Sequence, residues 1–135
     1  MITEYEANEI MQQRFKLGTA PAVPTTLYAM LSTTTINSDG TGATEPVLSG
    51  YTRVAITSSD TSWSTPAAGE ISNLTRIDFP QATDDWANIT YFALTDSATG
   101  GNIRCYQDLT SMKTVQTDDI VSFPIGYLKV KVSQA

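Results

Sequence analysis

The 135-residue sequence contains no histidine and only one cysteine, Cys105. Without histidine, the chain lacks the usual general base near neutral pH, the usual zinc ligand and every Ser-His or Cys-His nucleophile system. A single cysteine can form neither an intrachain disulfide nor a cysteine-based metal cluster. Its neighbours Ile103 and Tyr106 indicate a buried strand position, where a thiol behaves as an inert small hydrophobe. We therefore expect no catalytic residue, no cofactor and no metal, and hence a protein that is not an enzyme.

Basic residues and long apolar runs are also scarce. Eight Lys and Arg stand against fourteen Asp and Glu, which gives a net charge of −6. The basic residues are scattered, whereas phosphate binding needs clustered ones, so we expect no nucleic-acid partner. No apolar run approaches the roughly 20 residues that cross a bilayer, and the N-terminus lacks a charged-then-apolar signal pattern. The sequence therefore predicts a soluble protein without a membrane partner, made in a cytoplasm.

Short β-type segments make up most of the remaining sequence. Turn residues separate them at intervals of about 8 to 12 residues, the spacing of an all-β sandwich or barrel. Gly100-Gly101 fits a hairpin turn between two of them. The expected strands span residues 25–33, 51–57, 70–79, 86–95, 103–109, 113–116, 120–123 and 128–132. We predict a mainly β fold, an antiparallel β-sandwich or barrel of about seven or eight short strands with one N-terminal α-helix.

Residues 3–17 are the segment with a helical pattern. Thr3 is placed to cap the first turn, and Glu6, three residues later, could reach back to complete a capping box. Gly18 stands where a left-handed C-cap is wanted. Pro21 and Pro24 then form an extended joint, since each fixes its own φ and biases the preceding residue away from helix. The predicted organisation is an N-terminal docking helix and joint at 1–20, followed by a β-sandwich domain at 21–135.

Four residues form the candidate assembly interface. Ile10, Met11 and Phe15, together with Ala7, recur at spacings of three and four and so share one face of the helix. This stripe either packs on the chain's own sheet or docks on a neighbouring subunit. Trp63 lies in the polar segment 58–69, where it either folds back to cover the core or anchors an interface.

Other side chains that could take part in catalysis or ligand binding have simpler interpretations. Asp84-Asp85 and Asp118-Asp119 could supply oxygen ligands to calcium or a glycosidase-like pair, but their spacing matches no calcium loop, and we expect solvated turns. The six tyrosines and two tryptophans could line a sugar-binding platform. Their even spacing through the strands favours positions in the core and at its rim instead.

Several phrases, in order, resemble a family of small tailed-phage virion proteins commonly labelled tail fibre proteins. They are TLYAMLST at 26–33, LSGYTRVAIT at 48–57, ISNLTRIDFPQATDDW at 71–86, ALTDSATGGN at 93–102 and LTSMKTVQTDDIVSFPIGYLKVKV at 109–132. The resemblance covers nearly the whole chain and implies a structural protein located in the virion and assembled in the host cytoplasm. It implies no catalytic residue.

Two roles are compatible with that resemblance. A fibre shaft gains its length from a coiled coil, collagen-like sequence or repeats, and this sequence has none of them. We therefore expect a capsid decoration, or cement, protein that bridges subunits of the major capsid protein. The alternative is a tail fibre or baseplate-associated module that contacts tail proteins, which includes the case of a module that binds host-surface glycan. In either role we expect a homo-oligomer, a dimer or trimer.

Overall fold

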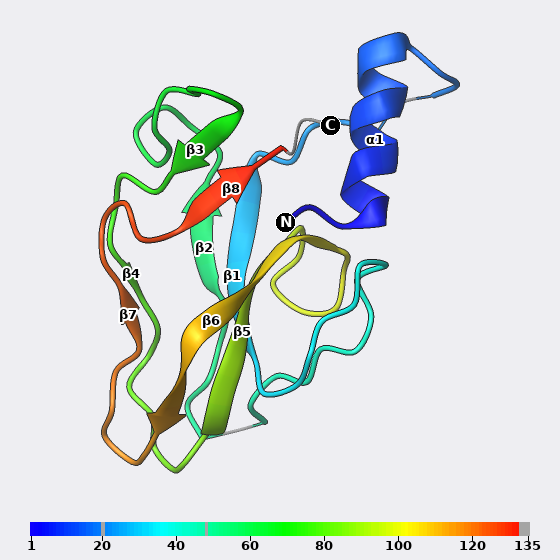
Figure 1. Cartoon of the computed structure of the whole chain (residues 1–135). Helices are drawn as coiled ribbons and strands as arrows, with labels where there is room; N and C mark the ends of the chain where they lie inside the picture. Colours follow the sequence, from blue (N-terminus) through cyan, green and yellow to red (C-terminus); the bar gives the residue numbers. More distant parts are fainter. Residues whose placement is uncertain (20, 48, 133–135) are drawn as a thin grey trace.

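A computed structural model describes residues 1–19, 21–47 and 49–132 of the chain. The fold is mainly β, as predicted, with one helix at the N-terminus (Figure 1). Within the described residues the elements are α1 Glu4–Phe15, β1 Thr26–Ser32, β2 Val54–Thr57, β3 Glu70–Ser72, β4 Ile77–Asp78, β5 Ala87–Thr95, β6 Ile103–Val115, β7 Ser122–Phe123 and β8 Lys129–Lys131. All strand pairs are antiparallel, and the sheets formed by these residues do not close into a barrel.

The main sheet has four strands in the order β2-β1-β5-β6. Its central strands are apolar on both faces because both faces are covered. On one face, Leu31 and Phe92 join the larger core under the two small ribbons β3-β8 and β4-β7. On the other face, Met30 and Ala93 pack against Ile36 from the long segment after β1. The result is a sandwich with one complete sheet and one fragmented layer.

Asn73 breaks the strand predicted for 70–79 into β3 and β4. Its side chain is fully buried, and its amide donates to the carbonyl oxygens of Thr75 and Pro124 at 2.8 and 3.0 Å. Its Oδ1 accepts from the backbone N–H of Leu128 at 3.0 Å. These bonds replace strand pairing at this position, so the prediction of one continuous strand is wrong. Conversely, the segments expected at 103–109 and 113–116 form the single irregular strand β6.

Helix α1 begins where the sequence predicts and ends differently. The backbone N–H of Glu6 donates to Thr3 Oγ1 at 3.2 Å, which confirms the N-cap. The prediction that the Glu6 side chain reaches back to complete the capping box is wrong, because the Glu6 carboxylate accepts a hydrogen bond from Arg104 instead. The left-handed C-cap is Lys16, with φ 52°, two residues before the predicted Gly18.

Residues 1–3 extend the main sheet along the outer edge of β6. The N–H of Tyr106 donates to the Met1 carbonyl at 2.8 Å, and the N–H of Thr3 donates to the Arg104 carbonyl at 2.9 Å. The chain therefore enters α1 directly from the sheet, and α1 projects away from the strands (Figure 1). This arrangement places the first turns of α1 beside β6 and its far end away from the core.

Candidate assembly interface

Helix α1 is attached to the sheet through a buried charge cluster around Arg104 of β6. Arg104 is 6% exposed. Its guanidinium donates to Glu6 at 2.8 Å, to Glu9, and to Asp96 of the β5–β6 turn at 2.9 Å. Tyr5 places its ring 4.9 Å from the guanidinium carbon, a cation–π contact. One cation thus holds three carboxylates, two of which come from α1.

The charge states of this cluster follow from these contacts. Burial opposes ionisation of Asp96, but hydrogen bonds from Asn102 and Arg104 outweigh it and hold the pKa of Asp96 below its usual value. Burial likewise opposes the charge of Arg104, yet its bonds to Glu6, Glu9 and Asp96 raise the pKa of Arg104 further above neutrality. Asp96 and Arg104 are therefore both ionised at neutral pH.

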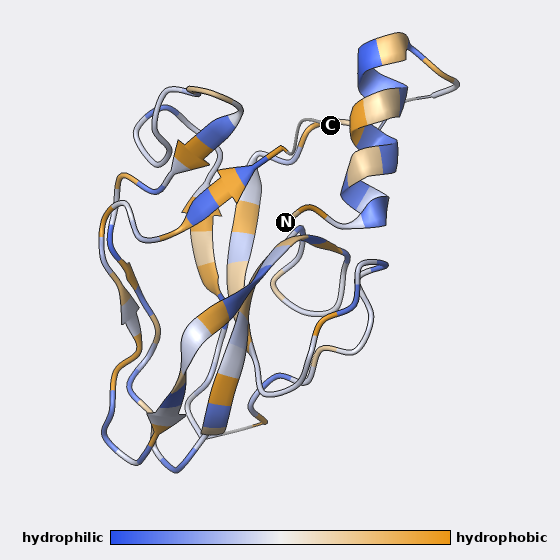
Figure 2. Ribbon diagram, in the orientation of Figure 1, coloured by the Kyte–Doolittle hydropathy of each residue, from blue (hydrophilic) through white to orange (hydrophobic). Residues whose placement is uncertain are grey.

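The orientation of α1 is the reverse of that of an ordinary surface helix. The buried residue of α1 is a glutamate, Glu9, at 5% exposure. Met11 and Phe15 are 53% and 62% exposed, whereas Ile10 is half-buried. At about 100° per residue, Phe15 points about 180° away from Glu6 around the helix axis. Glu6 and Glu9 thus face the sheet, whereas Met11 and Phe15 face solvent on the side of the helix that also carries Glu4 and Asn8. Figure 2 shows apolar and polar bands interleaved along α1.

This geometry decides between the two interpretations of the predicted stripe only in part. Met11 and Phe15 do not pack on the chain's own sheet, so that interpretation is wrong for these two residues. Docking of the stripe on a neighbouring subunit remains a prediction. We name the exposed pair, Met11 and Phe15, the apolar face of α1.

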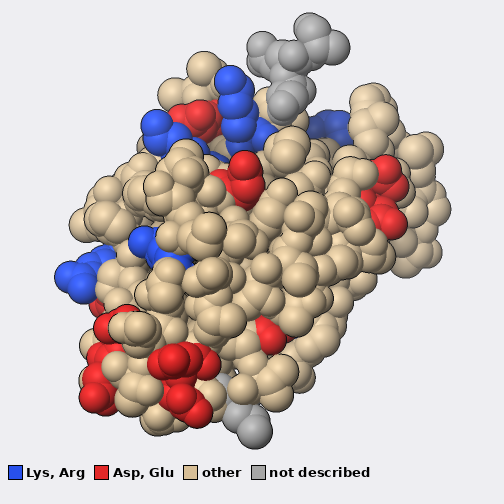
Figure 3. Space-filling view, turned by 60° about the horizontal axis from the view of Figure 1, so that its bottom comes forward, with Lys and Arg blue, Asp and Glu red and all other residues tan. Residues whose placement is uncertain are grey.

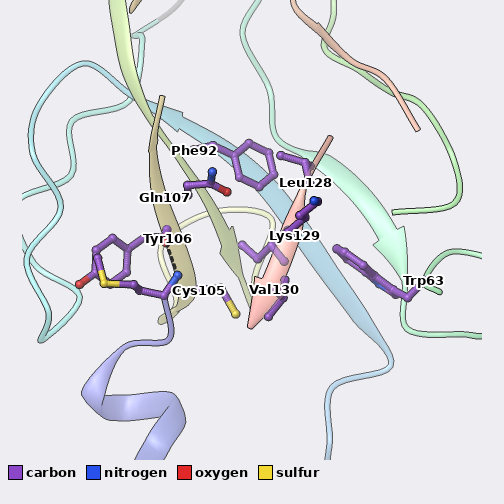
Figure 4. A pocket seen from close by; sticks show the side chains of 10 residues that line it. Trp63, Phe92, Cys105, Tyr106, Gln107, Leu128, Lys129 and Val130 are labelled. Carbon is purple, nitrogen blue, oxygen red and sulfur yellow. Dashed lines mark hydrogen bonds between the residues drawn. The ribbon is translucent and has the colours of Figure 1, made fainter. Parts of the chain in front are cut away.

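Trp63 lies in the core, remote from the apolar face of α1. It is 9% exposed, and its backbone bridges to Asn73. Figure 4 shows Trp63 on one side of an internal gap, with Tyr106 on the opposite side and Cys105 and Val130 between them. The expectation that Trp63 covers the core fits this position. A single chain therefore does not bring the four predicted interface residues together.

Cys105 lines this gap from β6 and is half-buried. Burial is the main cause that raises the pKa of the Cys105 thiol to about 12. A thiol with such a pKa is almost entirely protonated at neutral pH and is a poor nucleophile. The location in a strand and the inert character both agree with the sequence analysis.

The paired aspartates organise turns at one end of the sandwich. Asp85 accepts from the N–H of Thr117 at 3.0 Å, and Asp119 accepts from the N–H of Gln116 at 2.9 Å. Figure 3 shows acidic side chains close together on the face it presents. Among the described residues, no three acidic or cysteine side chains are arranged to hold a metal ion.

The aromatic side chains do not form one sugar-binding platform. Tyr106 is buried, and Tyr51 packs edge-on against Trp86 with ring centroids 5.3 Å apart. The Tyr51 hydroxyl donates to Glu45 at 2.7 Å and accepts from the N–H of Leu31 at 3.1 Å. These rings serve the core and its rim, as expected from their even spacing.

A family model described as podophage GP4 fiber I protein gp80 matches residues 1–131. The chain belongs to this gp80 family. A comparison with curated proteins finds no significant match. Membership in the gp80 family makes the chain a structural component of a phage virion, in association with other virion proteins. The family description favours the tail fibre alternative over the capsid decoration role that the sequence analysis placed first.

No helix in the described part of the chain is long and apolar enough to cross a bilayer.

Proposed function

We propose that this chain is a non-enzymatic structural subunit of a phage fibre assembly and that it joins other virion proteins through the apolar face of α1. The proposal combines the family match with the orientation of the helix. The observation that carries it is that α1 buries Glu9 and exposes Met11 and Phe15.

An exposed apolar helix face calls for a partner. Single exposed hydrophobic side chains are common, but Met11 and Phe15 are one turn apart and the exposed Leu17 follows them. Neighbouring exposed apolar side chains rimmed by polar ones mark protein interaction sites. The charge cluster around Arg104 holds α1 in this orientation, which keeps the apolar face available for assembly.

The dimensions of the fold suggest the position of the subunit within a fibre. Helix α1 has 12 residues, fewer than the three or four heptads of a stable coiled coil, and the described strands form no repeating stack. A fibre shaft gains its length from such elements. We therefore assign the chain to a compact joint or attachment point of the fibre. Within the described residues the exposed tyrosines are Tyr5 and Tyr127, one in α1 and one before β8, which does not favour a glycan-binding platform.

The test is to introduce Phe15→Asp into the phage and to measure the protein in purified particles. A charge at position 15 would have to be desolvated at the interface, so we expect the variant protein to fall to background in particles while wild-type protein is retained. Ile125→Asp is the matched control, because Ile125 is equally exposed, at 65%, and lies outside α1. Particles that retain the Phe15→Asp protein at the wild-type level would contradict the proposal.

A further inference from the structure

A cavity of about 490 Å³ opens between the main sheet and the layer formed by β3 and β8. Its floor is apolar and comes from five strands and one loop: Leu27, Ile71, Leu94, Cys105, Val130 and Trp63. Its rim is polar and includes Asp60 and Thr65 of the segment after β2, and Glu6 of α1. We name it the Trp63 cavity. Its volume lies within the roughly 300–1,000 Å³ range of pockets that enclose a drug-sized ligand, so it can accept one or two large side chains.

We propose that copies of this chain associate head to tail, with the apolar face of α1 in one copy seated in the Trp63 cavity of the next. This inference rests on the proposed function, since it names the partner of the apolar face. Three features of the molecule support it: the shape of the Trp63 cavity, the charges around the two surfaces and the distance between them.

The apolar face of α1 cannot enter the cavity of its own chain. Glu6 stands on the cavity rim, and α1 runs away from that point. Nine residues at 1.5 Å per residue place Phe15 about 13 Å farther along the axis, on the opposite side of the helix from Glu6. The apolar face of α1 can therefore enter the Trp63 cavity only of another molecule.

The charges around the two surfaces are complementary. Arg14 and Lys16 flank Phe15, and both are exposed. Neither is in a salt bridge with a residue of the described chain. Two carboxylates line the cavity: Glu6, which is paired with Arg104, and Asp60, which is in no salt bridge with a residue of the described chain. Insertion of Phe15 would bring Arg14 and Lys16 to the rim where Asp60 stands.

The two surfaces are different patches of one molecule, so the contact between copies is heterologous. A heterologous contact repeats from copy to copy and yields a ring or a linear array, according to the rotation between neighbours. Either product is an extended or multivalent assembly built from a compact subunit. This explains how a chain without a shaft element can take part in a fibre.

The test uses two variants of the full chain with opposite defects. Phe15→Asp removes the inserted side chain, whereas Thr65→Trp, at an exposed rim residue, blocks the cavity mouth without altering the core. Sedimentation should show that the wild-type chain associates and that each variant alone self-associates roughly tenfold or more weakly. Thermal unfolding of each variant in dilute, monomeric samples should match the wild type, which excludes misfolding. Ile125→Asp should associate normally.

The decisive measurement is the mixture of the two variants. Phe15→Asp keeps an intact cavity and Thr65→Trp keeps an intact helix face, so the mixture should form a one-to-one dimer and nothing larger. A mixture that stays monomeric, a Thr65→Trp variant that assembles like wild type, or a wild-type chain that stays monomeric would each overturn the head-to-tail contact. The proposed function has a separate readout: if Phe15→Asp is lost from particles while Thr65→Trp is retained, the helix face binds a different virion protein.

Discussion

At the scale of single residues, the described structure depends on polar side chains placed where apolar ones are usual. Arg104 joins β6 to α1, and Asn73 joins β3 to the segment before β8. Neither role could be predicted from sequence, because the partners are far apart in the chain. Glu9 and Arg104, for example, are separated by 95 positions. Local periodicity and capping patterns contain no information about such pairs.

Loss of Arg104 should be costly. Arg104→Met leaves Glu9 buried without a cation, and removing one partner of a buried ion pair costs about 3–5 kcal/mol. Urea denaturation should show this loss in the free energy of unfolding. The control is Arg76→Met: Arg76 pairs with Asp78 at 2.7 Å, but both side chains are at least half exposed, so the loss should stay below about 1 kcal/mol. Equal losses for the two variants would show that the cluster does not hold α1.

Acid should weaken the same cluster. The pKa of Asp96 is lower in the folded chain than its ordinary value of 3.8, so its ionised form stabilises the fold. That contribution is complete above the ordinary pKa and is lost as the pH falls through the lower, folded-state pKa. The difference in unfolding free energy between wild type and Asp96→Asn should therefore be constant above about pH 5 and shrink below about pH 4. A difference that grows as the pH falls would contradict the assignment.

At the scale of elements, the sequence predicts those that are specified locally. β1 and β5 lie within one residue of the predicted segments, since apolar residues on both faces suit strands covered on both faces. The start of α1 is also local, because Thr3 caps it. The break at Asn73 depends on distant contacts with Pro124 and Leu128, so the local pattern does not predict it. The end of α1 is also local, with Lys16 in the left-handed cap and the N–H of Leu17 bonded to Gln12, but the pattern places the cap at Gly18 instead. Met11 and Phe15 were identified from helical spacing, but spacing alone could not show that they face away from the sheet.

Replacement of phenylalanine by alanine should destabilise the fold strongly in β7 and hardly at all in α1. Phe123 is fully buried and meets Phe92 with ring centroids 5.0 Å apart, so Phe123→Ala should cost about 3–5 kcal/mol of unfolding free energy. Phe15 is 62% exposed, so Phe15→Ala in a dilute, monomeric sample should change it by no more than about 0.5 kcal/mol. Chemical denaturation measures both. A large loss for Phe15→Ala would mean that the helix face packs within its own chain.

At the scale of the whole molecule, the division into residues 1–20 and 21–135 remains a prediction. Residues 1–3 pair with β6, and Glu6 and Glu9 share a cluster with Arg104 and Asp96. These contacts tie the beginning of the chain to the sandwich. The far end of α1 makes no comparable contacts among the described residues. From these contacts we expect the mechanical boundary within α1 rather than after the joint at residue 20.

Hydrogen exchange can locate that boundary. The amides of Thr3 and Tyr106 are bonded across the junction, so we expect them to exchange only through global unfolding, together with the central strands. The amides of Arg14 and Phe15, at the exposed end of α1, should exchange at least roughly tenfold faster through local opening in a dilute sample. Rapid exchange at Thr3 and Tyr106 with an intact sheet would instead make residues 1–20 a separate unit. Slowing at Arg14 and Phe15 as the protein concentration rises would locate the assembly contact on the same helix end, because a docked helix cannot fray.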